Sequence, residues 1–377
     1  MLYVGMDVSS KSFVVHAIDE KKRVVRREEI EPSRRALKKL CVELGRGPKL
    51  MAFEAGNQMK WIADILKKQA GVTVHVVHPN EVKWIAESGG KKTDKVDARK
   101  LAELARGDLL PRKVHLVEGP TRQMRELVSA RAKLMRQRVS LINTLRGYLK
   151  QEGVKLSEKY FGQDDWKEQL AKKKVSATLK AIIEAYRPAV DSLKQSELEL
   201  VERLKRLSDN RTALLESVPS VGVLSARTVV SALDDASRFD NRKAVANYGA
   251  LTPTIFQSGG EVHLGRINRD GRQEVRRVML QCAHVLVRMK SPASAPLRDY
   301  FARLEQKRGK KKALVALARK LLVTCYGVLK SGQAFDPNKV LAKPPRVKAT
   351  SALRQKPRGP RPPTYVLNTT AKKGRRQ

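Results

Sequence analysis

The chain has 377 residues, of which 41% are hydrophobic, and its formal net charge is +40. The hydrophobic content is high enough for folded cores, which excludes a chain disordered throughout, and the length favours two or three domains. Enzymes of small acidic metabolites rarely need so positive a charge, whereas a polyanionic partner does, because each lysine or arginine placed on a phosphate releases condensed counterions.

The first third of the chain alternates patterns typical of strands and of helices. The predicted strands are residues 2–8, 12–18, 23–30, 49–55 and 72–79, and the predicted helices follow Pro32 and cover residues 59–69 and 80–89. Three strands at hairpin spacing, followed by alternating helices and strands, predict an α/β domain with a mixed sheet covered by helices.

The middle of the chain predicts two long helices. Residues 122–150 are strongly basic, and their apolar residues recur at every seventh position, namely Val128, Met135, Ile142 and Leu149. Residues 175–207 predict the second helix, with a kink at Pro188. The pair predicts an antiparallel, coiled-coil-like hairpin that packs within one chain or pairs protomers into a dimer or tetramer. Arg131 and Arg138 are predicted to contact nucleic-acid phosphates rather than bases.

The last third, residues 211–335, predicts an α-helical domain with glycine-rich turns. Residues 219–222 lie where a helix-hairpin-helix has its hairpin, whose backbone N–H groups can hold a DNA phosphate, and a plain turn explains them equally well. The tail, residues 343–377, is basic, proline-rich and free of acidic residues, a composition typical of disorder. The predicted domains are therefore residues 1–112, 113–210 and 211–335, followed by this tail.

Cysteine spacing and hydropathy indicate the cellular compartment in which the protein works. Cys41, Cys282 and Cys325 form no metal-binding or disulfide pattern, so we expect reduced core thiols in a cytoplasmic protein. The N-terminus is too short and too polar for a signal peptide, and no run of about eighteen apolar residues occurs, so we expect no membrane partner.

Four acidic residues occupy positions where α/β proteins place their chemistry. Asp7 ends the first predicted strand and Glu54 lies near the end of the 49–55 strand, while Asp94 and Asp97 share one face of a predicted helix. Four converging carboxylates would hold two divalent metal ions, and oxygen-only ligands favour Mg²⁺ or Mn²⁺ over zinc. Each acid alone is better explained by a cap or a salt bridge, so the hypothesis depends on all four together.

A second candidate site is Ser258, which precedes two glycines in a flexible turn. A serine on a glycine-rich loop beside arginines could attack a phosphodiester, because arginines offset the charge of the pentavalent phosphorane. A hairpin turn in which the serine serves geometry alone is the alternative, since no neighbouring base is evident. The basic residues predicted to bind nucleic acid near the two sites are Lys91, Lys92, Arg266, Arg269, Arg272 and Arg276, the last three on one helical face if a helix begins near Asp270.

Three motifs, GMDVSSKSF, FEAGN and KKTDKVDARKLA, together resemble the DEDD, RuvC-like domain of the IS110 family of insertion-sequence transposases. The resemblance continues through residues 122–150 and 213–290. In the family's C-terminal domain a Ser-Gly pair precedes a segment matched here by Gly265, Ile267, Arg269, Gly271 and Arg276. Arg269 stands where lysine is commoner and Val275 where leucine is commoner, and neither change removes the charge or the apolar character.

The resemblance implies an RNase-H-like fold whose metal-binding acids are Asp7, Glu54, Asp94 and Asp97. It implies that Ser258 attacks DNA and becomes covalently linked to it, and that a noncoding bridge RNA pairs with donor and target DNA, in the cytoplasm of a bacterium or archaeon near the nucleoid. The separation of Ser258 from the acids predicts a site completed within one chain or, as we favour, between protomers.

Two other functions share parts of this pattern. A RuvC-like, metal-dependent nuclease that acts on branched DNA would need the acids but not Ser258. A non-enzymatic scaffold for nucleic acid would need neither, because its acids would merely balance its charge.

Overall fold

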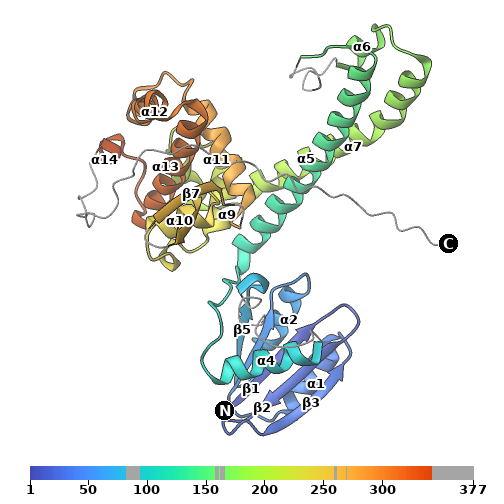
Figure 1. Cartoon of the computed structure of the whole chain (residues 1–377), viewed down its shortest axis with the longest axis vertical. Helices are drawn as coiled ribbons and strands as arrows, with labels where there is room; N and C mark the ends of the chain where they lie inside the picture. The colour runs from blue at the N-terminus through green and yellow to red at the C-terminus, as the bar shows by residue number, and fades with distance from the viewer. Residues whose placement is uncertain (82–93, 158–160, 162–165, 259–260, 269, 342–377) are drawn as a thin grey trace, which may run out of the picture. The chain divides into compact units, whose positions relative to one another are not determined.

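The structure is a computed structural model that describes residues 1–81, 94–157, 161, 166–258, 261–268 and 270–341. The chain divides into two compact units, residues 1–117 and 118–377 (Figure 1). The finer division into three domains and a tail stays a prediction. Most of the predicted helix 80–89 and the tail from residue 343 lie outside the described residues.

The first unit is built on a five-stranded sheet in the order β3-β2-β1-β4-β5. The strands are β1 (Leu2–Val8), β2 (Phe13–Ile18), β3 (Val24–Ile30), β4 (Lys49–Glu54) and β5 (Val72–Val77). β2 pairs antiparallel with β1 and β3, whereas β4 pairs parallel with β1 and β5. The predicted mixed sheet and its five strands are confirmed, and an antiparallel half joined to a parallel half is consistent with an RNase-H-like domain.

Helices cover both faces of this sheet (Figure 1). On one face, Val4 and Met6 of β1 join a core with α1 (Arg34–Glu43) and α2 (Met59–Leu66). Ser33 starts α1 by accepting a hydrogen bond from the Ala36 N–H. On the other face, Ala52 of β4 packs with Leu101 and Ala105 of α4 (Asp94–Arg106). Alternate residues of the strands therefore pack against the helices on the two different faces of the sheet, because successive side chains of a strand point to opposite faces.

Gly5 lets α4 approach β1 closely. A Cβ on Gly5 would lie 2.0 Å from the Ala98 carbonyl oxygen and 2.6 Å from the Ala102 nitrogen, so the helix backbone occupies the space of a side chain. His16, which pairs with Gly5 across the sheet, is buried on this face. Burial, followed by the nearby charge of Arg27, lowers the pKa of the His16 imidazole, which favours the neutral ring here.

We expect Gly5→Ala to destabilise the first unit by about 3 kcal/mol or more, because the added methyl group meets backbone atoms that cannot rotate away. Native-state hydrogen exchange of the β1 and α4 amides in the full chain measures the loss. Gly47→Ala is the matched control, since its Cβ would meet nothing within 4 Å. Equal protection in both variants would contradict the close packing of α4 on β1.

The second unit begins with a long helical hairpin, α5 (Gly119–Gln151) and α7 (Ala177–Arg206), with α6 (Trp166–Ala171) at its tip (Figure 1). Ile142 and Leu149 of α5 pack with Leu179 and Val190 of α7, and Val128 joins a core with Leu204. The helices are therefore antiparallel, which confirms the predicted hairpin. Of the heptad residues, Val128, Ile142 and Leu149 are buried within the chain and Met135 is half-buried. Pro188 lies inside α7, and the kink there stays a prediction.

The rest of the second unit is a helical body around one large core. Its helices are α8 (Asn210–Glu216), α9 (Val223–Leu233), η2 (Ala236–Arg238), α10 (Arg242–Tyr248), α11 (Gln273–Leu286), η3 (Pro292–Ser294), α12 (Ala295–Arg308), α13 (Lys310–Ser331) and α14 (Pro337–Leu341). Between α10 and α11 lies a hairpin of β6 (Pro253–Ser258) and β7 (Glu261–Ile267). The predicted helices on either side of residues 219–222 are confirmed as α8 and α9, and phosphate binding by that turn stays a prediction.

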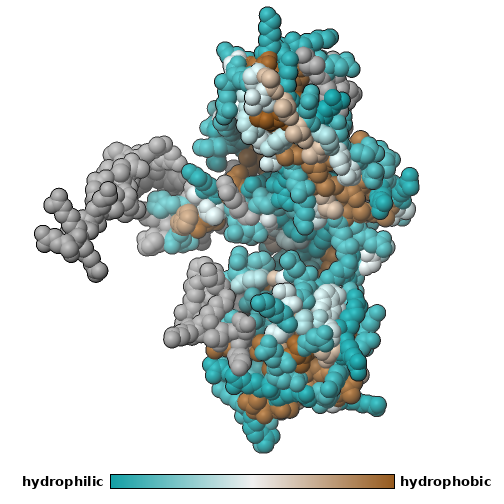
Figure 2. All heavy atoms as spheres, turned by 90° about the vertical axis from the view of Figure 1, so that its right-hand side faces the viewer, coloured by the Kyte–Doolittle hydropathy of each residue, from teal (hydrophilic) through white to brown (hydrophobic). Residues whose placement is uncertain are grey.

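The cysteines agree with the prediction from their spacing. The three cysteines are free and buried, and burial raises the pKa of the Cys325 thiol, so it stays protonated. Among the described residues, no helix is long and apolar enough to cross a membrane. Hydrophilic side chains cover most of the face shown in Figure 2, with hydrophobic ones in scattered patches.

Candidate catalytic sites

Asp7 and Glu54 lie side by side at one end of the sheet. β1 and β4 run parallel, and their last matched pair is Met6 with Phe53. Asp7 and Glu54 are the next residues on the two strands, so they are neighbours on the same face. Both are half-buried. Their placement at the carboxyl ends of adjacent parallel strands agrees with the prediction from sequence.

α4 brings a third acid to the same end. The helix packs on the face that carries Gly5 and Asp7, and its later residues Leu101 and Ala105 pack beside Tyr3 at the start of β1. Since Ala98 lies over Gly5, α4 runs antiparallel to β1, and its first turns lie toward Asp7. Asp97, half-buried, precedes Ala98 in these turns, and Asp94 is the first residue of the helix.

These acids form a donor set of oxygen atoms alone, which suits a hard divalent cation. Within the described residues no group of three or more His, Cys, Asp or Glu side chains already has the geometry to hold a metal ion. The side chain of Asp94 is outside the described part, as are Lys91 and Lys92. Metal binding by the four acids is therefore a proposal, argued below.

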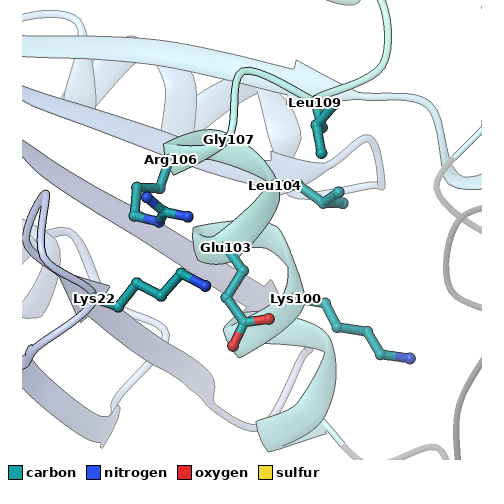
Figure 3. Close-up of a pocket in the computed structure, with 7 residues that line it drawn as sticks. All are labelled: Lys22, Lys100, Glu103, Leu104, Arg106, Gly107 and Leu109. Carbon is teal, nitrogen blue, oxygen red and sulfur yellow. The ribbon is translucent and has the colours of Figure 1, made fainter.

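A pocket, and none of the candidate catalytic residues, lies at the C-terminal end of α4. The pocket is lined by Lys22, Lys100, Glu103, Leu104, Arg106, Gly107 and Leu109. Figure 3 shows the side chains of Lys22 and Glu103 pointing toward one another, while Lys100 points away. No residue predicted from sequence to act in catalysis lines this pocket, so we do not place the chemistry there.

Ser258 ends β6, at the tip of the β6–β7 hairpin. Its backbone pairs with Glu261, and the side chain of Ser258 and residues 259–260 are outside the described part. The extended segment predicted before this serine is thus a strand, and the two glycines of the predicted turn lie outside the described residues. The nucleophilic role of Ser258 stays a proposal.

Hydrogen bonds hold the base of this hairpin. The side-chain oxygen of Asn247 accepts hydrogen bonds from Thr252 Oγ1 at 2.9 Å and from Asn268 Nδ2 at 3.4 Å. The Asn268 N–H donates to the Thr252 carbonyl at 2.8 Å, and the Arg272 N–H donates to the Tyr248 carbonyl at 2.7 Å. Asn247 therefore joins both sides of the hairpin to the end of α10, and the sequence alone did not single it out.

The arginines after the hairpin are not arranged as predicted. α11 begins at Gln273 with Arg272 as its N-cap, so only Arg276 of the three arginines expected on one helical face lies in the helix. Gly271 explains the later start, because its Cα touches α10: a Cβ there would lie 2.6 Å from the Asn247 and Tyr248 carbonyl oxygens. Arg266 of β7 is exposed, Arg272 and Arg276 are half-buried, and Arg269 is outside the described residues.

Two family models match this chain. Residues 4–153 match the DEDD transposase domain of IS110 elements, and residues 212–298 match the transposase domain of the IS116/IS110/IS902 family. The chain belongs to the IS110/IS116/IS902 family of transposases. It is accordingly an enzyme of DNA strand cleavage and transfer, which implies DNA binding, and its DEDD domain implies the use of divalent metal in general.

Full-length relatives agree with this assignment. The chain is 25% identical over 356 residues to a "Probable family 20 transposase" of Pseudomonas aeruginosa, which covers 89% of this chain and 98% of the relative. It is 23% identical over 344 residues to the "Transposase for insertion sequence element IS1111A" of Coxiella burnetii, with 88% and 90% covered. A "Pilin gene-inverting protein" of Moraxella bovis is 31% identical over 130 residues, 34% of this chain and 39% of that protein.

Arg131 and Arg138 of the transposase form ion pairs between the two helices of the α5–α7 hairpin. Both guanidinium groups bind the buried carboxylate of Glu197 on α7, Arg131 Nη2 at 2.9 Å and Arg138 Nη2 at 3.0 Å. About a quarter of each arginine side chain is exposed. Their contact with DNA phosphates stays a prediction, and the structure adds that they hold α5 against α7.

We expect Glu197→Ala to destabilise the α5–α7 hairpin by roughly 1–3 kcal/mol, because two half-buried cations lose their counter-charge. Hydrogen exchange of the α5 and α7 amides measures this change. Glu199→Ala, which removes an exposed carboxylate from the same helix, should change the free energy by less than about 0.5 kcal/mol. Unchanged protection in the Glu197 variant would show that the two ion pairs contribute nothing to the hairpin.

Three further arginines were missed from sequence. The carbonyl groups at the end of α9, those of residues 231–234, accept hydrogen bonds from three arginine side chains. These are Arg125 of α5, Arg238 of η2 and Arg211 of α8. Burial lowers the pKa of the Arg125 guanidinium, which shows how far this group is removed from solvent. No sequence signal separates these structural cations from arginines that bind DNA, because both kinds look alike in a basic chain.

Proposed function

We propose that this transposase cuts and rejoins DNA with metal-bound carboxylates in its first unit and with Ser258 as a covalent nucleophile in its second. The observation that carries the proposal is the adjacency of Asp7 and Glu54 beneath the first turns of α4, which bears Asp94 and Asp97. A mixed sheet with this acid placement supports the assignment of the first unit as RNase-H-like and RuvC-like.

Asp7, Glu54, Asp94 and Asp97 would hold the metal, which we propose to be Mg²⁺ or Mn²⁺ because the donors are all oxygen. When bound, such ions stabilise negative charge on phosphate oxygens and lower the pKa of an attacking group. The protein's part is to fix the carboxylates. The strands hold Asp7 and Glu54 in register, and the glycine contact at Gly5 fixes the distance of α4 from the sheet.

Ser258 would form the covalent link. In the proposed step the Ser258 Oγ forms a bond to phosphorus as the bond between phosphorus and the leaving nucleoside oxygen breaks. The serine hydroxyl gives up its proton, and the leaving oxygen gains one. Arg272 and Arg276 are half-buried next to the hairpin base, five strand residues away from Ser258 at its tip, so they would bind other phosphates of the same DNA rather than the phosphate under attack.

The net charge and the buried heptad residues bear on the partners of the transposase. The net charge of +40 suits a bridge RNA as well as DNA. A homo-oligomer would need a surface other than Val128, Ile142 and Leu149, because these heptad residues are buried within the chain. Sequencing the RNA and DNA that copurify with the transposase tests both nucleic-acid partners, and recovery of DNA alone would contradict the guide RNA.

One assay separates this function from its rivals. The transposase is incubated with a nicked suicide DNA carrying an insertion-sequence end, with and without Mg²⁺, and protein-linked DNA is sought on a denaturing gel. We expect a covalent adduct that depends on the metal. Cleavage without an adduct would favour the structure-specific nuclease, and neither cleavage nor an adduct would favour a non-enzymatic scaffold.

A further inference from the structure

The β6–β7 hairpin exposes two large apolar side chains next to Ser258. Ile255 is 64% exposed and Phe256 is 63% exposed. Because successive strand residues point to opposite faces, each face of the hairpin presents one of them. Phe256 is the one exposed phenylalanine among the described residues, which makes it a feature to explain rather than part of a core.

The ring of Phe256 is held in place from one side. It covers Gly265 on β7, where a Cβ would lie 2.8 Å from the ring atom Cε2. Thr254 Oγ1 donates a hydrogen bond to the Arg266 carbonyl at 2.8 Å, which fixes the strand pairing beside this contact. One side of the aromatic ring therefore rests on backbone while most of its surface stays open to solvent.

Exposed polar side chains lie near Phe256 on the partner strand. His263 pairs with Phe256 across the hairpin and is exposed, and the cationic side chain of Arg266, which follows Gly265, is also exposed. An open aromatic ring on the same hairpin as an exposed arginine suits single-stranded nucleic acid, because a base can stack on the ring while the cation holds a phosphate. A protein partner would have to cover the Arg266 guanidinium, whereas a nucleic-acid phosphate would neutralise it.

We propose that Phe256 is a stacking platform for an unpaired base of the DNA strand that the transposase cuts. The proposal rests on the proposed function in one respect, the position of the base. Phe256 precedes Ser258 by two residues, about 7 Å along the strand, so the stacked base would belong to a nucleotide next to the phosphate that Ser258 attacks. Stacking there would hold the strand in place and keep the base out of the duplex.

Photocrosslinking tests the stacking directly. The full-length transposase is irradiated with a single-stranded thymidine oligonucleotide of about 20 nucleotides that carries 5-iodouracil at its centre, and the crosslinked peptide is identified by mass spectrometry. We expect the crosslink at Phe256. We also expect Phe256→Ala to weaken binding of this oligonucleotide roughly tenfold or more, and Phe256→Trp to restore it, whereas Phe256→Leu should not.

Ile255→Ala is the matched control, because it removes an equally exposed apolar side chain from the other face of the hairpin. Its affinity should stay within about twofold of the original. Crosslinking that spares Phe256, together with unchanged affinity of Phe256→Ala, would overturn the proposal. So would an altered oligomeric state of Phe256→Ala with unchanged DNA affinity, measured by light scattering, since that result would make the ring a contact between copies.

The Ser258→Ala protein separates this inference from the proposed chemistry. Stacking needs no bond cleavage, so that variant should crosslink through Phe256 like the original transposase. Crosslinking at Phe256 without any protein–DNA adduct in the original protein would contradict the serine mechanism alone. An adduct at Ser258 without crosslinking at Phe256 would contradict the stacking platform alone.

Discussion

Ser258→Ala should abolish the covalent protein–DNA adduct and lower strand transfer by on the order of 10³-fold or more, because no other group replaces the attacking oxygen. Double-stranded DNA affinity should stay within about twofold, since a single hydroxyl contributes little to a contact dominated by phosphate charge. The adduct is measured on the suicide DNA by denaturing gel, and the attachment site by mass spectrometry.

Ser192→Ala is the control for this variant, because Ser192 is exposed on α7, in the same unit but outside the β6–β7 hairpin. It should form the adduct at the original rate. Strand transfer by Ser258→Ala at the original rate would remove the serine mechanism and leave the metal-dependent nuclease as the better account of the acids.

Whether the acids and Ser258 act within one chain or between chains can be tested with the same variant. Ser258→Ala is mixed with Asp7→Ala under conditions where subunits exchange. A site shared between protomers predicts partial recovery of strand transfer, because some assemblies then hold one intact set of groups. Strict inactivity of the exchanged mixture would show that each chain completes its own site.

The elements of the first unit could be predicted from sequence because each follows a short-range rule. Apolar runs gave β1 to β5, and the ends of parallel strands predicted that Asp7 and Glu54 would be neighbours. The contact between Gly5 and α4 could not be predicted in this way. It joins residues that are far apart in the sequence, and a glycine in a strand carries no signal of the helix that covers it.

The serine hairpin shows where local rules fail. A helix starting near Asp270 agrees with the spacing of its arginines, yet tertiary contacts override the pattern. The Arg272 N–H donates to the Tyr248 carbonyl, and Gly271 lies against the α10 backbone, so the helix begins only at Gln273. Likewise, the ion pairs of Arg131 and Arg138 with Glu197 could not be predicted, because Glu197 is about sixty residues away in the sequence. Contact of these arginines with DNA phosphates stays a prediction.

The second prediction with a large effect concerns the acids. Asp7→Ala, Glu54→Ala and Asp97→Ala should each lower strand transfer by on the order of 10³-fold while DNA binding persists, because the carboxylates act as one unit in holding the metal. Each variant should also lose the covalent adduct, provided that the metal assists attack by Ser258. Strand transfer, adduct formation and DNA affinity are measured on the same DNA.

Glu29→Ala is the matched control, since it removes an exposed carboxylate from β3, at the opposite edge of the sheet from β5, and should leave all three quantities unchanged. Asp7→Asn sharpens the test, because it keeps the size of the side chain and one oxygen donor but removes the charge that a divalent cation requires. If Asp7→Asn is as inactive as Asp7→Ala and raising the Mg²⁺ concentration partly restores either variant, the carboxylate acts through the metal. Normal strand transfer by any two of the alanine variants would contradict the metal site.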